Sequence, residues 1–234
     1  EPIMDCLCAL GYTKEQSSKY SLTKRGHRFF SEKSRFSMKN TILFSDYVFE
    51  ALSDLEENVK RGGPKDVNLD LFTPRQWDNF NKTMIEVAGS NAEEIAKILP
   101  KRDNFKTLLD IGGSHGLHAI AFCRKIPGMR ASILDLAPVK PYAEKVINEN
   151  KMENRIRFQV GDFLKDKIAG KYDVVFAFNI IHGLRPRVNE KLTKEVFAAL
   201  NPNGMYVILD QIKDATGGSD LSRVVSAAQG LMLF

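Results

Sequence analysis

The chain has 234 residues, of which 43% are hydrophobic and 27% are charged, and it carries a formal net charge of +5 at pH 7. This length suits one large domain or two modest ones, and the composition is ordinary for a globular protein. No apolar run of about eighteen residues and no secretory signal pattern occurs, so no membrane-spanning helix is predicted. The mild positive charge permits contact with nucleic acid but does not indicate it.

Three cysteines, Cys6, Cys8 and Cys123, form neither a disulfide framework nor a metal-binding spacing. We therefore expect a reducing, cytoplasmic setting and no metal site. The chain opens on Glu1-Pro2 and closes on an apolar run over residues 230–234. Such a terminus would expose core surface, so we expect the N-terminal domain to be incomplete at its start and the sheet to lack its last strands.

The beginning of the chain is predicted to fold as a helix, a short hairpin and a second helix. A helix is expected over residues 2–10, because Pro2 suits the first helical turn and Gly11 ends the pattern. A short alternating strand over residues 20–23 precedes a helix over residues 24–30. This order is typical of the end of a winged-helix unit.

Residues 19–39 carry seven Lys or Arg side chains against one acid, Glu32. A basic wing of this kind can contact DNA phosphates, which leaves a DNA-binding regulator open as an alternative. A solvated face on a dimerisation domain explains the same charges, and we favour this interpretation. We therefore expect a homodimer without a nucleic-acid partner.

An amphipathic helix is predicted over residues 41–60, since apolar residues recur at spacings of three and four. The members of this stripe are Phe44, Val48, Leu52, Leu55 and Val59. The sequence Gly-Gly-Pro at 62–64 ends the helix, and residues 65–71 read as a linker. We therefore place a winged-helix-like and helical dimerisation region over residues 1–72 and an α/β domain over residues 73–234.

Two helices are predicted before the first strand of the α/β domain. The first has an N-cap at Thr73, a proline at the next position and a capping-box Gln76. The second is expected to begin at Asn91 and to end before Pro100. One face of the first helix, which belongs either to the core or to a substrate pocket, carries Trp77, Phe80, Met84 and Val87.

From residue 106 onward the pattern alternates between strand and helix, which predicts a doubly wound, mainly parallel sheet with right-handed crossovers. The predicted strands are residues 107–111, 130–134, 155–160, 173–178 and 205–209. The helices between them are residues 117–125, 139–150 and 189–200. The predicted fold class is therefore α/β and Rossmann-like, with an α-rich N-terminal domain.

The stretch from Thr107 to Leu117 joins the first strand to a helix through a glycine turn. A buried parallel strand that hands over to a helix in this way leaves backbone N–H groups free for a ligand. The Gly-x-Gly-x-x-Gly pattern of dinucleotide sites fails, because Ser114 and Leu117 fall where glycines belong. The pattern present is Asp-x-Gly-Gly-x-x-Gly, from Asp110 to Gly116.

Polar residues also follow the next three strands, at the edge where ligands bind in such sheets. Asp135 ends the second strand, where a carboxylate can accept hydrogen bonds from both ribose hydroxyls. Asp162 and Phe163 end the third, where a carboxylate can take an adenine amino group and a ring can stack on the base. The fourth ends in the run from Asn179 to His182. Three carboxylates at successive strand ends, together with the glycine loop, predict a nucleoside-containing ligand.

This ordered set resembles the class I S-adenosylmethionine-dependent methyltransferases over about residues 105–210. The small-molecule O-methyltransferases with an N-terminal winged-helix dimerisation domain are the most similar, because Gly161-Asp162-Phe163 and Ile181-His182 fit their motifs and Tyr20-x-Leu22-Thr23-x-x-Gly26 resembles their wing. Their Asp-Leu-Pro-x-Val is only approximated at residues 135–139. The resemblance implies S-adenosyl-L-methionine as cofactor, bound by Asp110, Gly112, Gly113, Gly116, Asp135, Leu136, Asp162, Phe163 and Asn179.

His182 matches the catalytic histidine of plant-type O-methyltransferases, although Gly183-Leu184 follows it here in place of their usual Asp-Trp. A sulfonium-bound methyl group is already activated, so the enzyme must align the donor with the acceptor and remove a hydroxyl proton. Histidine, with an ordinary pKa near ~6.5, can do this at pH 7. The alternative is a structural role in the loop. His115 and His118 are expected to be structural, and His27 to be solvated.

The sequence therefore predicts an S-adenosylmethionine-dependent methyltransferase that methylates a hydroxyl group on a small aromatic or polyketide-like molecule. Methylation of nitrogen or carbon on a small molecule stays open, as does a DNA-binding regulator that uses the fold as a cofactor sensor. Methylation of adenine or glutamine amino groups is disfavoured, because residues 179–182 lack the Pro-Pro of such enzymes. No cysteine is placed for methylation of cytosine at C5.

Overall fold

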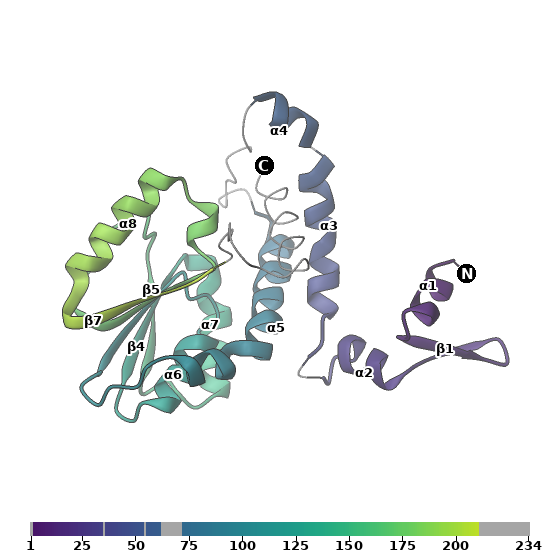
Figure 1. Ribbon diagram of the computed structural model, residues 1–234, viewed down its shortest axis with the longest axis horizontal. Coiled ribbons are helices and arrows are strands. Elements are labelled where there is room, and N and C mark those ends of the chain that lie inside the picture. Colours follow the sequence, from purple (N-terminus) through teal and green to yellow (C-terminus); the bar gives the residue numbers. More distant parts are fainter. Residues whose placement is uncertain (1, 35, 54, 62–71, 211–234) are drawn as a thin grey trace, which may run out of the picture.

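The computed structural model describes residues 2–34, 36–53, 55–61 and 72–210, with backbone only at residues 47, 48 and 50–52. The predicted helix stop at 62–64, the linker at 65–71 and the apolar run at 230–234 lie outside the described residues. So do Arg35 of the basic wing and the side chains of Val48 and Leu52. Figure 1 shows the N-terminal elements to one side of a sheet that is flanked by helices.

The predicted helix, hairpin and helix at the start of the chain are confirmed as α1 (Pro2–Ala9), β1 (Thr13–Gln16), β2 (Lys19–Leu22) and α2 (Lys24–Phe30). Thr23 caps α2 by accepting a hydrogen bond from the N–H of Gly26 at 3.1 Å. A Cβ atom on Gly26 would lie 2.0 Å from the carbonyl oxygen of Tyr12, so only glycine fits there. The assignment of this unit to the winged-helix class stays a prediction.

The predicted helix over residues 41–60 is helical at every described residue, and residue 54 within it lies outside the described residues. The structure has α3 (Lys39–Ser53) and α4 (Leu55–Arg61), and α4 turns away from the axis of α3 (Figure 1). Phe44 of the predicted stripe packs against Phe80, with ring centroids 6.0 Å apart. Val59 is 57% exposed. The stripe therefore packs against α5 at Phe44, whereas its last member, Val59 in α4, is exposed.

The two helices predicted between residues 73 and 100 are one helix, α5 (Pro74–Ile98), so the predicted new start at Asn91 is wrong. Its capping box at Thr73 and Gln76 is confirmed. Gly89 costs roughly 1 kcal/mol relative to alanine within a helix. Burial of the helix offsets this cost: Ala88 is buried, and Ala92 and Ala96 pack against α6. Val87 is 42% exposed and does not share the inward face of α5.

The predicted parallel sheet is confirmed, with all five strands parallel in the order β5-β4-β3-β6-β7. The strands are β3 (Thr107–Ile111), β4 (Arg130–Asp135), β5 (Ile156–Val160), β6 (Tyr172–Phe178) and β7 (Leu200–Leu209). Between them lie α6 (Leu117–Lys125), η2 (Ala137–Val139), α7 (Lys140–Glu149), η3 (Ile181–Gly183) and α8 (Pro186–Ala199). Strand β7 begins five residues before its predicted start, because residues 201–204 form a bulge between its pairs with Tyr172 and Val174.

Two cores cover the two faces of the sheet. On one face Leu108 packs with buried residues of α6 and α7, and on the other Leu109 packs with buried residues of α8. Successive residues of β3 are therefore buried on opposite faces, which explains its unbroken apolar run. Figure 1 shows α8 on one side of the sheet and α5, α6 and α7 on the other.

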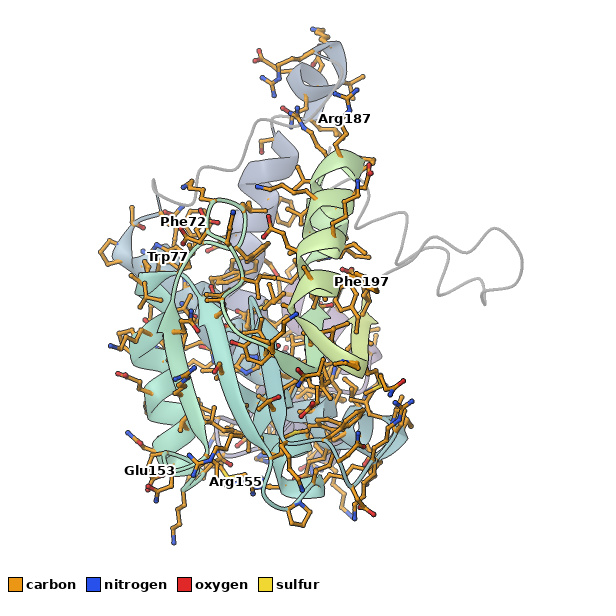
Figure 2. The ribbon with its side chains drawn as sticks, turned by 90° about the vertical axis from the view of Figure 1, so that its left-hand side faces the viewer. Phe72, Trp77, Glu153, Arg155, Arg187 and Phe197 are labelled. Atoms are coloured by element: carbon orange, nitrogen blue, oxygen red, sulfur yellow. The ribbon has the colours of Figure 1, made fainter. Side chains whose placement is uncertain are left out.

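This topology brings the carboxyl ends of β5, β4, β3 and β6 side by side, and we call this edge the carboxyl edge. Figure 2 shows Phe72 and Trp77 near this edge and Glu153 and Arg155 at the opposite one, where β5 begins. Within the described parts of the chain, no helix has the length and apolar character needed to cross a membrane.

Candidate functional site

The glycine loop after β3 is folded tightly against its surroundings. Gly112 (φ +61°) and Gly116 (φ +74°) adopt the left-handed conformation that glycine tolerates without strain. A Cβ atom on Gly112 would lie 2.3 Å from Cδ1 of Ile180, and one on Gly113 would lie 2.5 Å from Cγ of Asp110. Side chains would clash at both positions, and the bare backbone can approach a ligand closely.

Ser114, which follows Gly113 in the loop, is also left-handed (φ 45°). This conformation costs a non-glycine residue roughly 1–2 kcal/mol. Its backbone N–H donates to Oδ2 of Asp135 at 2.9 Å, which offsets part of that cost. Its hydroxyl group is buried without a hydrogen-bond partner, so the loop presents an unsatisfied polar group to a ligand.

Asp110 and Asp135 end the neighbouring strands β3 and β4 and form an acidic pair. Asp110 is 1% exposed, and its Oδ2 atom has no hydrogen-bond partner. Burial and the nearby charge of Asp135 raise the pKa of Asp110 to about 8. Burial also raises the pKa of Asp135 to about 6, although hydrogen bonds from the N–H groups of Leu136 and Ser114 act to lower it. A positively charged ligand would relieve the repulsion in this pair.

The pKa of Asp110 should make the free energy of unfolding depend on pH. Between its ordinary value near ~3.9 and about 8, the folded chain holds a proton at Asp110 that the unfolded chain has released. As the pH falls from about 8 to 6.5, Asp110 should therefore add stability with a slope that approaches roughly 1.4 kcal/mol per pH unit, and Asp110→Asn should remove this contribution to the slope. The neutral rings of His115 and His118 oppose part of the slope, equally in both proteins. Urea unfolding at pH 6.5, 7.2, 8 and 9 measures it.

The matched control for this slope is Asp173→Asn. Asp173 lies at the start of β6. Burial raises its pKa, but hydrogen bonds outweigh this effect and hold the pKa below the usual range. The N–H groups of Lys106 and Thr107 are among the donors. Its replacement should lower stability and leave the slope above pH 6.5 intact. Equal slopes in wild type and Asp110→Asn would contradict the prediction.

At the end of β5, Asp162 and Phe163 flank the glycine loop. The Asp162 carboxylate accepts from the N–H of Leu164 at 2.9 Å and pairs with Nζ of Lys165 at 3.0 Å. Burial raises the pKa of Asp162, but these contacts outweigh it and keep the pKa below the usual range. Cε1 of Phe163 lies 3.7 Å from the position of a Cβ on Gly112, so the ring borders the loop. The pair therefore offers an ionised acceptor and an aromatic wall.

The end of β6 turns sharply into η3. Asn179 is left-handed (φ 55°) with an exposed side chain, and its N–H donates to the carbonyl of Leu209 at 2.7 Å. Three residues later, Nδ1 of His182 lies 2.7 Å from Oδ1 of Asp210, and the N–H of His182 donates to Oδ2 of the same carboxylate at 3.2 Å. The side chain of Asp210 is 1% exposed and that of His182 is 23% exposed.

This contact sets the chemistry available to His182. A buried carboxylate beside Nδ1 favours the tautomer in which Nδ1 carries the proton, which leaves Nε2 with a free lone pair. An imidazole oriented in this way can accept a proton at Nε2 as a general base. Sequence reasoning missed Asp210, although its position directly after the fifth strand marks it as another strand-end acid.

His115 is buried and His118 is half-buried at the start of α6, as expected of structural residues. Burial lowers the pKa of His115 to about 3, with a further contribution from His118, whose own pKa burial lowers to about 4. Nδ1 of His115 accepts from the N–H of Leu117 at 3.0 Å. Both rings are therefore neutral at pH 7, and His115 satisfies a backbone donor at the helix start.

The residues of the carboxyl edge fit a cationic, ribose-bearing cofactor. The glycine loop leaves no room for side chains at Gly112 and Gly113. Asp110 and Ser114 present buried polar atoms without hydrogen-bond partners, and Asp135 offers an acceptor at the end of the adjoining strand. The structure brings together along this edge the predicted residues Asp110, Gly112, Gly113, Gly116, Asp135, Leu136, Asp162, Phe163, Asn179 and His182. Within the described ranges, no group of three or more His, Cys, Asp or Glu side chains could hold a metal ion.

A parallel α/β sheet with this edge defines a nucleoside-cofactor-binding domain of the methyltransferase class. The chain belongs to the O-methyltransferase domain family, whose model matches residues 68–232. S-adenosylmethionine is the cofactor of this family. The resemblance found in the sequence motifs is thereby confirmed.

Two relatives and one solved structure show the breadth of the family. L-tyrosine C(3)-methyltransferase of Streptomyces lavendulae is 27% identical over 191 residues, which cover 76% of this chain and 52% of the relative. The tetracenomycin polyketide synthesis 8-O-methyl transferase of Streptomyces glaucescens is 28% identical over 141 residues, which cover 60% of this chain and 41% of the relative. Human N-acetylserotonin methyltransferase in complex with SAM matches with a TM-score of 0.82 at 18% identity, covering 99% of this chain and 70% of that one. The chain spans about half the length of these curated relatives or less.

Proposed function

We propose that this chain forms the cofactor-binding and catalytic core of an S-adenosylmethionine-dependent O-methyltransferase whose acceptor is a hydroxyl group on a small aromatic or polyketide-like molecule. The observation that carries this proposal is the contact of 2.7 Å between His182 Nδ1 and Asp210 Oδ1. A histidine held in this tautomer serves acceptors that must lose a proton, and a hydroxyl is such an acceptor. S-adenosylmethionine, when bound, supplies a methyl group already activated on a sulfonium.

The chain's own residues would divide the remaining work. The glycine loop and Asp110 would receive the charged end of the cofactor, Asp135 its ribose hydroxyls, and Asp162 with Phe163 its base. Ile180 touches the glycine loop two residues before His182, since its Cδ1 lies 2.3 Å from where a Cβ on Gly112 would be. His182 therefore stands beside the loop that would hold the methyl donor, and Nε2 would take the acceptor's proton.

The names of the relatives support an aromatic or polyketide-like acceptor and keep one rival open. One relative is named for methylation of an oxygen in polyketide synthesis and another for methylation of a ring carbon of tyrosine. Carbon methylation of a phenol also benefits from a base, because the phenolate is the more reactive nucleophile. The DNA-binding regulator, whose support is the basic wing, would need sequence-selective DNA binding at physiological salt.

We further propose that residues 1–72 serve as a dimerisation region, distinct from the cofactor-binding domain at 73–234, and that two copies of the chain associate through it. The support is apolar surface on this region: Phe49 is 74% exposed, and Ile3, Ile42, Leu43 and Val59 are exposed as well. Apolar side chains exposed on one region are typical of an interaction surface.

The cysteines are unpaired, which supports the prediction of a reducing, cytoplasmic setting.

The test of the proposed function is ligand binding to the purified chain. S-adenosylmethionine and S-adenosylhomocysteine should both bind in calorimetric titrations, because the glycine loop and the strand-end carboxylates suit them. NAD should not bind, since the loop lacks the glycine register that a pyrophosphate needs. Binding of NAD at comparable strength, or no binding of S-adenosylhomocysteine, would contradict the proposal.

A further inference from the structure

The segment that follows Asp135 is tied to the glycine loop through the Asp135 carboxylate. Asp135 accepts from the N–H of Leu136 at 2.7 Å and from the N–H of Ser114 at 2.9 Å. From Leu136 the chain passes through η2 into the first turn of α7, and Pro138 and Pro141 limit its backbone freedom. Any shift of residues 136–142 would therefore be transmitted to the Asp135 carboxylate through the Leu136 N–H.

A pocket of about 720 Å³ separates this segment from the start of α5. Phe72, Pro74 and Trp77 line one side, and residues between Leu136 and Tyr142 line the other. Figure 2 shows Phe72 and Trp77 at the carboxyl edge of the sheet. Because open space rather than packed side chains lies between the two walls, close packing does not fix the position of residues 136–142 on this side.

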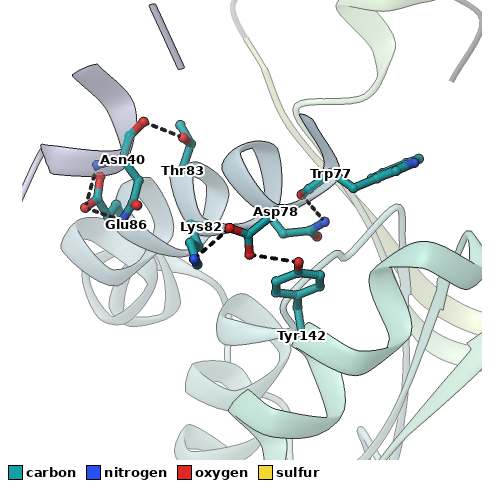
Figure 3. Close-up of polar contacts among 8 residues, drawn as sticks. Asn40, Trp77, Asp78, Lys82, Thr83, Glu86 and Tyr142 are labelled. Carbon is teal, nitrogen blue, oxygen red and sulfur yellow. Dashed lines mark hydrogen bonds and ion pairs between the residues drawn. The ribbon is translucent and has the colours of Figure 1, made fainter. Parts of the chain in front are cut away.

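One hydrogen bond crosses between the two walls. The hydroxyl group of Tyr142 donates to Oδ1 of Asp78 at 2.9 Å, and Nζ of Lys82 donates to Oδ2 of the same carboxylate at 2.7 Å (Figure 3). The hydrogen bond from Lys82 is the main cause that holds the pKa of Asp78 below its usual range. Tyr142 therefore donates to an ionised acceptor, and such bonds are stronger than those between neutral groups.

Helix α5 is itself firmly anchored, so it can serve as a fixed support. At the start of α3, the Glu86 carboxylate accepts from the N–H of Asn40 at 3.1 Å (Figure 3) and from the N–H of Thr41 at 3.0 Å. Further along, the buried Ala92 and Ala96 pack against α6. The hydrogen bond from Tyr142 to Asp78 therefore ties the segment after β4 to a fixed support.

We propose that Tyr142 and Asp78 are positioning residues for Asp135. Their hydrogen bond holds the segment after β4 against α5 and keeps the Asp135 carboxylate in position to bind the ribose hydroxyls of the cofactor. This inference rests on the proposed function, because it takes Asp135 as the ribose ligand. Without the bond, residues 136–142 can relax into the pocket, and Asp135 must be repositioned each time the cofactor binds.

The test is titration of S-adenosylhomocysteine into wild type, Tyr142→Phe, Asp78→Asn and the double variant. Each single change should weaken binding by about three- to tenfold, as expected when part of a hydrogen bond to a charged group is lost. The double variant should bind no more weakly than the weaker single one, because both changes remove the same bond. Trp77 is the chain's one tryptophan and lines the pocket, so its fluorescence gives a second readout.

Tyr172→Phe is the matched control. Its hydroxyl donates to the carbonyl of Ala169 at 2.9 Å, away from the pocket, and its loss should change affinity less than twofold. A purely structural role for Tyr142 would lower the melting temperature and leave the dissociation constant unchanged. Asp78→Asn keeps the shape of the side chain, so it provides the comparison if Tyr142→Phe folds poorly.

A double-mutant cycle that combines Tyr142→Phe with Asp135→Ala separates this inference from the proposed function. In an Asp135→Ala background, Tyr142→Phe should have no further effect on S-adenosylhomocysteine binding, because the group that it positions is gone. If wild type binds the ligand but Tyr142→Phe and Asp78→Asn bind equally well, or if the losses from Tyr142→Phe and Asp135→Ala multiply, the positioning role is overturned. If wild type does not bind the ligand, the proposed function fails first.

Discussion

Replacing His182 with alanine should lower turnover by roughly 10²–10⁴-fold, the range for loss of a general base, while affinity for S-adenosylmethionine stays nearly unchanged. His182 contacts Asp210 through both its N–H and its Nδ1 atom, and Asp210 is not among the residues expected to hold the cofactor. Its contribution should therefore appear in the step that removes the acceptor's proton. The measurement is steady-state kinetics with an aromatic hydroxyl acceptor identified by a screen with labelled methyl donor.

The pH dependence of the loss tests the assigned role. A phenol ionises with a pKa of about 10, so at high pH the acceptor needs no base and the deficit of His182→Ala should shrink. An acceptor nitrogen that already carries its lone pair would show no such rescue. His27→Ala, which changes an exposed histidine of α2, serves as the control and should be fully active. Full activity of His182→Ala near neutral pH would mean that alignment of the substrates alone accounts for catalysis.

Asp210 should act through the same step. Asp210→Asn leaves an amide beside Nδ1, which no longer selects the tautomer with a free Nε2. Turnover should fall, and the double variant with His182→Ala should be no slower than His182→Ala alone, because the two residues act as a unit.

Asp135→Ala should weaken the binding of S-adenosylmethionine by about 1.5–3 kcal/mol, the range for a hydrogen bond to a charged group. At the carboxyl edge, Asp135 is the acid that ends β4, and it already orders the glycine loop through the N–H of Ser114. Its removal should therefore cost affinity both directly and through the loop. Calorimetric titration of the purified variant measures the change.

Asp173→Ala is the matched control for Asp135→Ala. Asp173 also joins neighbouring strands through backbone N–H groups, those of Lys106 and Thr107, but at the opposite edge of the sheet. Its loss should lower stability and leave cofactor affinity unchanged. Unchanged affinity in Asp135→Ala would remove Asp135 as the ribose ligand and, with it, the basis for a positioning role of Tyr142.

The region around the glycine loop could be predicted from sequence alone. The apolar run that ends at Ile111, the glycines at 112, 113 and 116, and the helix from Leu117 to Lys125 all appear in the structure as expected. Their signals are carried by adjacent residues, through burial on both faces and backbone conformations that favour glycine. Parallel strands share one edge, so the polar residues after each strand could also be expected to gather there.

Local signals misled where packing outweighed them. The pattern at Asn91 predicts a new helix start, yet α5 continues through this position because Ala92 and Ala96 pack against α6. The strand predicted at residues 205–209 missed Leu200, which also pairs with β6 on the far side of a register shift at residues 201–204. Propensities of about 1 kcal/mol per residue are small beside the burial of a helix or strand face.

The sequence by itself determined which residues end each strand, and only the tertiary structure decided which of them meet across the edge. Asp210 lies 28 positions after His182, and Asp78 lies 64 positions before Tyr142. Neither separation has a periodic signal. The pairing of Phe178 with Leu209 in β6 and β7 brings Asp210 level with the turn that carries His182. That register follows from burying both faces of the sheet at once, a requirement that no short stretch of the chain contains.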